Sequence, residues 1–419
     1  MQFHRETLDN GLEVIAETSD AAVSTSIGFF VGAGARDESD DLAGVSHFLE
    51  HMTFKGTKDL SADDINRQFD WMGASANAFT SEEDTVYYAA VLPDQQQQAV
   101  SLLGKMMRPA LRKEDFDTEK LVILEEIRMY DDQPPFGADD RCRASFFGNH
   151  PLARSVLGSV DTIEALPVER MREYHRMRYT PENIVLAASG VVDFPNLVES
   201  AKQLCGTWER VSLPERRQSP PAVTHSSTEA IVRDSASLEY VIRMTAGPSA
   251  ADEERWAAKM LSLVLGDDSG SRLYWDLVDS GFAEHASLQH YDFLDAGVFA
   301  TQISCAADAT EKILLRILEL YREAATHGIR EDEWERARNK LSSRVVLAGE
   351  RPRRRLFAIG LEWAHEQIYR SIADDLSIVE SVSLEGIHDV LRRWPLDGHA
   401  STVLAGPETA SILSSMKPE

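Results

Sequence analysis

Alternating and continuous runs of apolar residues predict the elements of the first part of the chain. Residues 12–18 alternate like a strand after the turn signal Asn10-Gly11, which predicts a strand there. Residues 25–32 contain a continuous apolar stretch, which indicates a strand buried more deeply. From Leu42 to His51 the apolar period becomes helical. The remaining predicted elements are helices over 63–72, 94–107 and 114–131, two strand-like runs within 75–92, and an apolar strand over 182–192.

A segment rich in proline, serine and charge separates this part of the chain from a second one. Pro214, Pro220 and Pro221 interrupt any helix over 211–229, so we interpret 211–229 as a linker. After it the order of elements repeats: 238–245 corresponds to 25–32, 253–265 to 42–53, 330–341 to 112–123, and 401–407 to 184–190. We therefore predict an α+β protein of two homologous halves with mixed or antiparallel sheets, 1–210 and 230–419.

The net charge and the length of the apolar runs argue against some classes of binding partner. The chain has 419 residues and a formal net charge of −26, which argues against nucleic acid and against anionic membranes as partners. An acidic protein attracts cationic ligands such as basic peptides, although solubility alone explains the charge equally well. Apolar runs stay below the ~20 residues of a membrane-spanning helix, and no secretory signal is expected.

The three cysteines, Cys142, Cys205 and Cys305, are far apart and form no C-x-x-C pair. This pattern predicts neither a disulfide framework nor a thiolate zinc site. Buried, reduced cysteines fit a cytoplasmic protein, so we expect a cytoplasmic location.

Two histidines and a glutamate lie close together in the predicted helix that begins at Leu42. His47 and His51 are four residues apart and share one helix face, where both imidazoles can reach one ion. Zinc accepts imidazole nitrogen at ~2.0–2.1 Å and takes three protein ligands in catalytic sites, which leaves one position for water. Glu50 lies beside His51 and is the candidate base that takes the proton as this water attacks a carbonyl. The order H-x-x-E-H is the signature of inverted zincins.

The third ligand is expected from the predicted helix over 114–131. This helix carries Glu119, Glu125 and Glu126, and the apolar run 121–124 predicts that it is largely buried. A buried carboxylate requires a cation or hydrogen bonds, and zinc meets that requirement for Glu126. Glu119 lies seven residues earlier, nearly on the same face, and is the candidate to hold a ligand histidine from behind. The spacing by itself leaves Glu125 open as the ligand.

A histidine pair with an intervening glutamate also occurs by chance on helices that bind nothing. The partner helix with aligned carboxylates favours a metal site here. In the second half, 259–265 takes the place of 46–52 without any ligand, and the equivalent of Glu126 falls near Arg344. One half is therefore predicted to carry the chemistry.

The other histidines form no comparable cluster and are predicted to be surface or structural residues: His4, His150, His175, His225, His285, His290, His327, His365, His388 and His399.

Two segments carry a resemblance to a known family. Residues 44–57 read GVSHFLEHMTFKGT, which resembles the signature of the pitrilysin and mitochondrial-processing-peptidase family of inverted zincins. Residues 119–134 read EKLVILEEIRMYDDQP, which resembles the third-ligand helix of that family. Its spacing from His51 selects Glu126 over Glu125. Residues 74–88 and 179–190 are also similar to family segments, and the chain looks like a short, bacterial processing-peptidase-like form.

The resemblance implies a zinc-dependent endopeptidase with one Zn²⁺ per chain and with Glu50 as general base on the zinc-bound water. It implies two halves that close like a clamshell, and a peptide or unfolded-protein substrate that adds a strand to a sheet edge. The matching edge residues are Asn77, Ala78, Phe79 and Thr80. An ordinary buried strand explains these four residues equally well.

One departure from the family bears on function. Many members carry an arginine and a tyrosine in the second half, where this chain has Val278 and Glu284-His285, although Arg272 and Tyr274 lie nearby. This departure bears on substrate preference and leaves the zinc site untouched. The family also contains non-catalytic members, so the resemblance leaves an alternative function, a non-catalytic or partner-dependent subunit of a processing-peptidase-like assembly. Assembly as a homodimer, or as a heterodimer with a related chain, is compatible with the resemblance.

Overall fold

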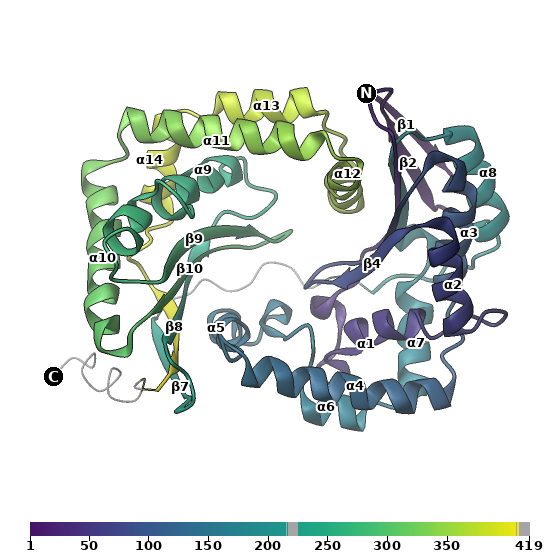
Figure 1. The fold of residues 1–419 in the computed structure, drawn as a ribbon, viewed down its shortest axis with the longest axis horizontal. Coiled ribbons are helices and arrows are strands. Elements are labelled where there is room, and N and C mark those ends of the chain that lie inside the picture. The colour runs from purple at the N-terminus through teal and green to yellow at the C-terminus, as the bar shows by residue number, and fades with distance from the viewer. Residues whose placement is uncertain (215, 217–224, 408, 410–419) are drawn as a thin grey trace. The chain divides into compact units, whose positions relative to one another are not determined.

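The computed structural model describes residues 1–214, 216, 225–407 and 409 (Figure 1). They form two compact units that are interleaved along the chain. Unit 1 consists of Met1–Ile127, Arg154–Arg216 and Val345–Asp374, and unit 2 consists of Arg128–Ala153, Arg217–Arg344 and Asp375–Glu419. Each unit contains one sheet with helices packed on it, which confirms the predicted α+β class.

Unit 1 is built on a six-stranded sheet in the order β1-β2-β6-β3-β5-β4. Strands β2 and β6 are parallel, and all other neighbours are antiparallel, so the sheet is mixed as predicted. The central strand β3 is buried on both faces, which explains its continuous apolar sequence. The strands are β1 (Gln2–Thr7), β2 (Glu13–Thr18), β3 (Thr25–Val31), β4 (Ser75–Thr80), β5 (Thr85–Val91) and β6 (Ile184–Gly190).

Helices cover both faces of this sheet. Phe29 and Phe30 point to opposite faces, because successive side chains of a strand alternate. Phe29 joins the core beneath most of the unit's helices, and Phe30 packs under helix α12. The helices with residues in unit 1 include α1 (Val45–Thr53), α2 (Ala62–Met72), α3 (Gln96–Met106), α4 (Lys113–Asp132), α6 (Val160–Ala165), α7 (Val168–Arg178), α8 (Phe194–Cys205) and α12 (Pro352–Glu366).

Unit 2 is built on a five-stranded sheet in the order β7-β11-β8-β10-β9. Helix α5 (Ala138–Phe147) covers one face and packs Cys142 and Phe146 against strands β8 and β11. The strands are β7 (Ser227–Val232), β8 (Glu239–Gly247), β9 (His285–Asp292), β10 (Gly297–Cys305) and β11 (Ala400–Gly406). The other helices are α9 (Arg255–Gly266), α10 (Thr310–His327), α11 (Glu331–Gly349), α13 (Ile372–Ser381) and α14 (Leu384–Arg393).

The predicted internal repeat is visible in the strand orders. The series β2-β6-β3-β5-β4 and β7-β11-β8-β10-β9 have the same connections, and in each the first pair is parallel and the others are antiparallel. Helices α5 and α12 also correspond, since each follows the long helix of its half, α4 or α11. Helix α5 comes from the first half of the chain but covers the sheet of unit 2. Helix α12 comes from the second half but covers the sheet of unit 1.

This exchange makes the units differ from the contiguous segments 1–210 and 230–419. Residues 128–153 belong to unit 2 and residues 345–374 to unit 1, because α5 and α12 bury their apolar faces there. Of the predicted linker 211–229, residues 215 and 217–224 lie outside the described residues, and strand β7 begins within its last part.

Helix α4 is less buried than its apolar sequence suggests. Ile123 and Ile127 are buried, but Leu121 and Val122 are 65% and 47% exposed. The helix buries one stripe only, so the prediction of a largely buried helix is wrong.

The three cysteines are buried and form no disulfide, as expected. Within the described residues, every helix is too short or too polar to cross a membrane.

Candidate metal centre

Helix α1 begins at a position that only glycine fits easily. Gly44 has φ +91°, and a Cβ there would overlap the backbone of Leu157 and Gly158. The N-terminus of the helix is held by Glu38, whose carboxylate accepts hydrogen bonds from the backbone N–H groups of Gly44 and Ser46, both at 2.7 Å. Burial raises the pKa of Glu38 to about 8.

The structure brings His47, His51 and Glu126 together. One ligand atom from each of the three residues lies within 4.8 Å of the others. The Nε2 atoms of His47 and His51 lie 3.7 and 3.6 Å from the two carboxylate oxygens of Glu126. These separations are too long for hydrogen bonds, but they suit three atoms around one ion at ~2.0–2.2 Å.

Glu119 contacts the ring nitrogen of His51 that points away from Glu126, and Lys55 contacts Glu119 in turn. The Nδ1 atom of His51 lies 2.9 Å from Glu119 Oε1, and Lys55 Nζ lies 2.5 Å from Glu119 Oε2. A carboxylate on Nδ1 keeps the proton there and leaves the Nε2 lone pair free. The sequence analysis did not identify Lys55 as a partner of Glu119, although its position four residues after His51 was a possible signal.

The two histidines differ in their surroundings. Burial, helped by the neighbouring charge of His51, lowers the pKa of His47 to about 4, so His47 is neutral near pH 7. Burial also lowers the pKa of His51, but the hydrogen bond to Glu119 and the charges of Glu126 and Glu50 outweigh it, so this pKa lies above its ordinary value. Among the described residues, His47 Nδ1 has no hydrogen-bond partner.

This donor set fits zinc. Two imidazole nitrogens and one carboxylate are ligands that zinc takes in catalytic sites, where a fourth position stays open. The Nε2 atoms of His47 and His51 both face Glu126. His51 also has a carboxylate partner, Glu119, on its other ring nitrogen, which is typical of a metal-binding histidine.

Glu50 lies next to the group on the same helix and is hydrogen-bonded to a residue of strand β4. The hydroxyl of Thr80 donates a hydrogen bond of 2.6 Å to Glu50 Oε2. Burial raises the pKa of Glu50, which the Thr80 hydrogen bond partly opposes. Sequence reasoning placed Thr80 among residues that touch substrate and missed this contact.

Strand β4 is an edge strand, as the sequence-based hypothesis of substrate binding requires. Its four candidate residues have different surroundings. Ala78 is buried, Asn77 is exposed, and the ring of Phe79 lies 5.7 Å from the ring of Phe357 on helix α12. The side chains of Ala78, Phe79 and Thr80 are therefore engaged within unit 1, and the edge offers its backbone.

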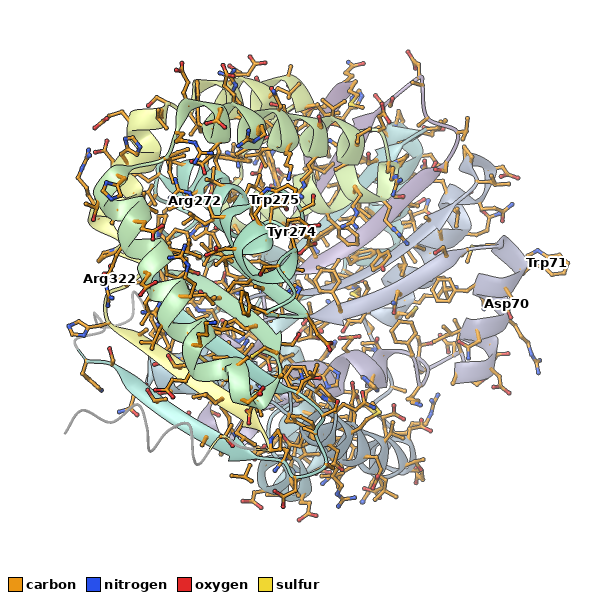
Figure 2. The ribbon with its side chains drawn as sticks, turned by 60° about the vertical axis from the view of Figure 1, so that its left-hand side comes forward. Asp70, Trp71, Arg272, Tyr274, Trp275 and Arg322 are labelled. Carbon is orange, nitrogen blue, oxygen red and sulfur yellow. The ribbon has the colours of Figure 1, made fainter. Side chains whose placement is uncertain are left out.

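Arg272, which lies near the positions of the family's arginine and tyrosine, is already bonded within the second half. Arg272 donates hydrogen bonds of 2.9 and 2.8 Å to the two oxygens of Glu333 and one of 2.9 Å to the carbonyl of Gly328. Tyr274 and Trp275 follow in a single π-helical turn, and Trp275 is 60% exposed (Figure 2).

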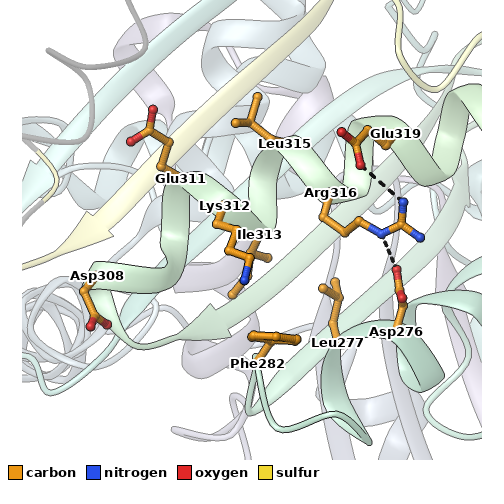
Figure 3. Close-up of a pocket in the computed structure, with 10 residues that line it drawn as sticks. All are labelled: Asp276, Leu277, Phe282, Asp308, Glu311, Lys312, Ile313, Leu315, Arg316 and Glu319. Atoms are coloured by element: carbon orange, nitrogen blue, oxygen red, sulfur yellow. Dashed lines mark hydrogen bonds and ion pairs between the residues drawn. The ribbon is translucent and has the colours of Figure 1, made fainter.

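A separate cavity of about 520 Å³ lies in unit 2, beside helix α10 (Figure 3). It is lined by apolar side chains such as Phe282 and Leu315 together with ion pairs. Arg316 contacts Asp276 at 2.6 Å and Glu319 at 3.2 Å, so its charge is already compensated. None of the lining residues belongs to the histidine and glutamate group.

Comparisons with known proteins agree with this geometry. Residues 13–160 match the family described as Insulinase (Peptidase family M16), and residues 165–341 match the Peptidase M16 inactive domain. The chain is 32% identical over 409 residues to an uncharacterized zinc protease of Mycobacterium tuberculosis, covering 96% of this chain and 93% of that protein. It is 27% identical over 403 residues to an uncharacterized zinc protease of Bacillus subtilis, covering 96% and 98%.

A solved structure shows the same fold. The crystal structure of a protease from Helicobacter pylori superimposes with a TM-score of 0.91 at 21% identity, covering 97% of this chain and 99% of that one. The predicted resemblance is thus confirmed, and the chain belongs to peptidase family M16.

Proposed function

We propose that this protein is a zinc-dependent endopeptidase that hydrolyses peptide bonds in extended peptides or unfolded segments. The observation that carries the proposal is the convergence of His47, His51 and Glu126 on one point beside Glu50. The relatives that are named zinc proteases support the same activity.

In this proposal His47, His51 and Glu126 hold one zinc ion per chain. A bound zinc ion would supply a Lewis acid and lower the pKa of a water molecule that it binds. Glu50 takes a proton from the attacking water as its oxygen bonds to the scissile carbonyl carbon, and it passes that proton to the amine as the C–N bond breaks.

The edge of strand β4 is the proposed site for the substrate backbone. An extended peptide that pairs with an edge strand gains main-chain hydrogen bonds, which hold it without regard to sequence. The net charge of −26 supports basic peptides as the preferred substrates. Equal cleavage rates for matched basic and acidic peptides would remove that preference.

The test measures zinc content together with cleavage of a mixed peptide library, for the wild type and for Glu50→Gln. About one zinc per chain in both proteins, with cleavage by the wild type only, is the expected result. Cleavage by Glu50→Gln at the wild-type rate would contradict the role of Glu50 as the base. Absence of zinc from both proteins would contradict the metal centre.

A partner-dependent peptidase is the second candidate. The observation that favours it is that Arg272 is already bonded to Glu333. Val278 and Glu284-His285 also stand where many family members have an arginine and a tyrosine. Zinc in both proteins with cleavage by neither would support this candidate. A related chain that restores cleavage on mixing would establish it.

A further inference from the structure

The Glu50 carboxylate has a single hydrogen-bond donor among the described side chains. That donor is the hydroxyl of Thr80, the last residue of β4, at 2.6 Å from Glu50 Oε2. Hydrogen bonds of this length between a hydroxyl and a carboxylate are short and charge-assisted. Such a bond restricts the rotation of the carboxylate, which is otherwise free about its terminal torsion.

We propose that Thr80 is a positioning residue for Glu50. Thr80 and Ala78 share the face of β4 that is turned toward helix α1, because side chains alternate along a strand. The hydroxyl therefore acts on the base, while the backbone of the same strand offers the edge for a substrate. The inference rests on the proposed function, since it takes Glu50 as the base of that reaction.

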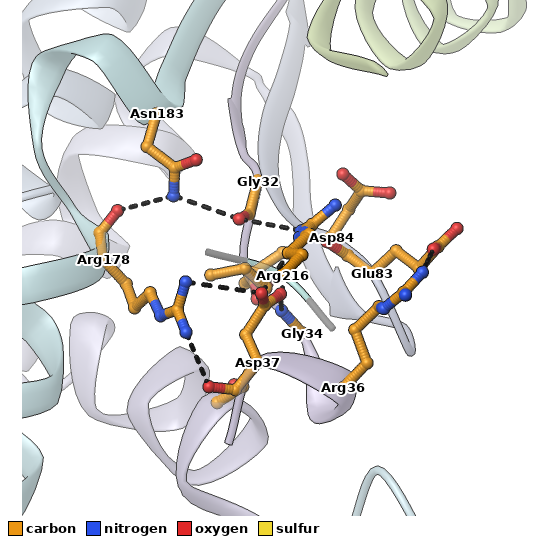
Figure 4. Close-up of polar contacts among 12 residues, drawn as sticks. Gly32, Gly34, Arg36, Asp37, Glu83, Asp84, Arg178, Asn183 and Arg216 are labelled. Carbon is orange, nitrogen blue, oxygen red and sulfur yellow. Dashed lines mark hydrogen bonds and ion pairs between the residues drawn. The ribbon is translucent and has the colours of Figure 1, made fainter. Parts of the chain in front are cut away.

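The turn after Thr80 is fixed by charged groups from elsewhere in unit 1 (Figure 4). Arg36 forms an ion pair with Glu83, and both side chains are buried. Arg216 donates a hydrogen bond of 2.7 Å to the backbone carbonyl of Glu83. Within the turn, the backbone N–H of Ser81 donates to the carbonyl of Asp84 at 2.8 Å.

Helix α12 adds another support to this turn. His365 Nε2 lies 2.8 Å from a carboxylate oxygen of Asp84, whose backbone carbonyl closes the turn at Ser81. Anchored on these sides, the end of β4 presents the Thr80 hydroxyl to Glu50 in one orientation. Catalytic groups require such support, because a displacement of ~1 Å can cost ~100-fold in rate.

The experiment compares Thr80→Val, Thr80→Ser and Thr7→Val in steady-state cleavage of a peptide that the wild type hydrolyses. Thr80→Val removes the hydroxyl and keeps the branched shape, whereas Thr80→Ser keeps the hydroxyl. Thr7→Val is the matched control, because the Thr7 hydroxyl also donates a 2.6 Å hydrogen bond to a carboxylate, that of Glu13, on another pair of strands. Thr80→Ala serves as a second hydroxyl-free variant if valine prevents folding.

We expect Thr80→Val to lower kcat by about 10- to 100-fold with KM and zinc content unchanged. Thr80→Ser should retain most of the wild-type kcat, and Thr7→Val should retain all of it. A kcat of Thr80→Val equal to that of Thr7→Val would overturn the proposal. A higher KM at unchanged kcat would also overturn it, because the hydroxyl would then contact substrate.

Crystal structures provide a readout that does not depend on cleavage. The Glu50 carboxylate should leave its wild-type position in Thr80→Val and keep it in Thr80→Ser. An unchanged Glu50 in Thr80→Val would overturn the inference even in an active enzyme. If the wild type cleaves no peptide, the proposed function fails, and these structures still decide whether Thr80 positions Glu50.

Discussion

At the scale of single residues, the candidate centre depends on which atoms of each side chain are already engaged. His51 has its Nδ1 atom tied to Glu119, so only Nε2 is available to an ion. Glu126 directs both carboxylate oxygens toward the two Nε2 atoms. Glu125, the adjacent residue, is exposed and lies outside the group.

The two neighbouring glutamates make a sharp test of the ligand set. Glu126→Gln should weaken zinc binding by more than the ~10–100-fold that loss of an outer partner typically costs, because it removes a charged ligand. Glu125→Gln should bind zinc as the wild type does. Competitive titration against a chelator measures both affinities, and a loss of zinc from Glu125→Gln alone would reverse the assignment.

At the scale of elements, helix α12 is held to the sheet of unit 1 by close apolar contact and by buried ion pairs. Leu356 and Trp363 pack on strands β3 and β6, and Arg355 forms an ion pair of 2.5 Å with Glu17. Gly360 lies where the ring of Phe30 approaches the helix backbone, so a Cβ at this position would overlap the ring. Packing therefore explains a glycine in the middle of a helix.

Gly360→Ala should destabilise the protein although alanine favours helices. Overpacking against Phe30 is expected to lower the free energy of unfolding by ~1–3 kcal/mol. Gly104→Ala in helix α3 is the control, because its Cβ would meet Leu204 at an ordinary 3.4 Å. That variant should be neutral or gain up to ~1 kcal/mol from helix propensity. Urea unfolding of both variants measures the difference, and a stabilised Gly360→Ala would refute the close approach.

The ion pair of His365 with Asp84 should make the stability of unit 1 depend on pH. Burial lowers the pKa of His365, but the hydrogen bond to Asp84 and the charges of Asp84 and Glu83 outweigh burial and the opposing charge of Arg216, so the pKa lies above its ordinary value of 6.5. The folded state thus favours the protonated ring. The stabilisation is complete below about pH 6.5 and is lost as pH rises through the raised folded pKa.

His365→Asn should remove this part of the pH dependence. The loss of stability on going from about pH 6 to about pH 8 should be smaller in the variant than in the wild type, because asparagine does not titrate. Unfolding of the zinc-free proteins in urea at both pH values measures this. An equal loss in both proteins would show that His365 does not titrate in this range.

At the scale of the whole molecule, the two units are linked by exchanged helices. Unit 1 depends on α12 from residues 352–366, and unit 2 depends on α5 from residues 138–147. Without α12, the sheet of unit 1 would expose a face that includes Ile15, Phe30 and Val86, all fully buried here. A contiguous half of the chain therefore leaves an apolar sheet face uncovered, which favours aggregation.

Separate expression of 1–210 and 230–419 tests this dependence. Each fragment alone should aggregate or lack a cooperative unfolding transition, and co-expression should recover a complex that binds zinc. Light scattering and thermal unfolding report the two outcomes. A monomeric fragment 1–210 with a cooperative transition would show that α12 is dispensable for unit 1.

The sequence alone predicted strands β2 to β6, helices α1 to α4 and the histidine pair of the candidate metal centre, because all of these depend on local spacing. Four residues separate His47 from His51, which places them on one helix face wherever the helix lies. The periods of strands and helices are equally local, and they predicted the central strand and the long helix. Glu126 needed the family resemblance, since spacing within a helix cannot choose between adjacent carboxylates.

The tertiary structure decided what depends on segments far apart in the chain. No local pattern pairs Thr80 with Glu50 or Lys55 with Glu119, because such contacts arise only when a strand end or a second helix is placed against α1. For the same reason the periodicity of residues 352–366 predicts an amphipathic helix without naming the sheet that it covers. Long-range packing therefore selected the partner for each apolar face, and it oriented the candidate base.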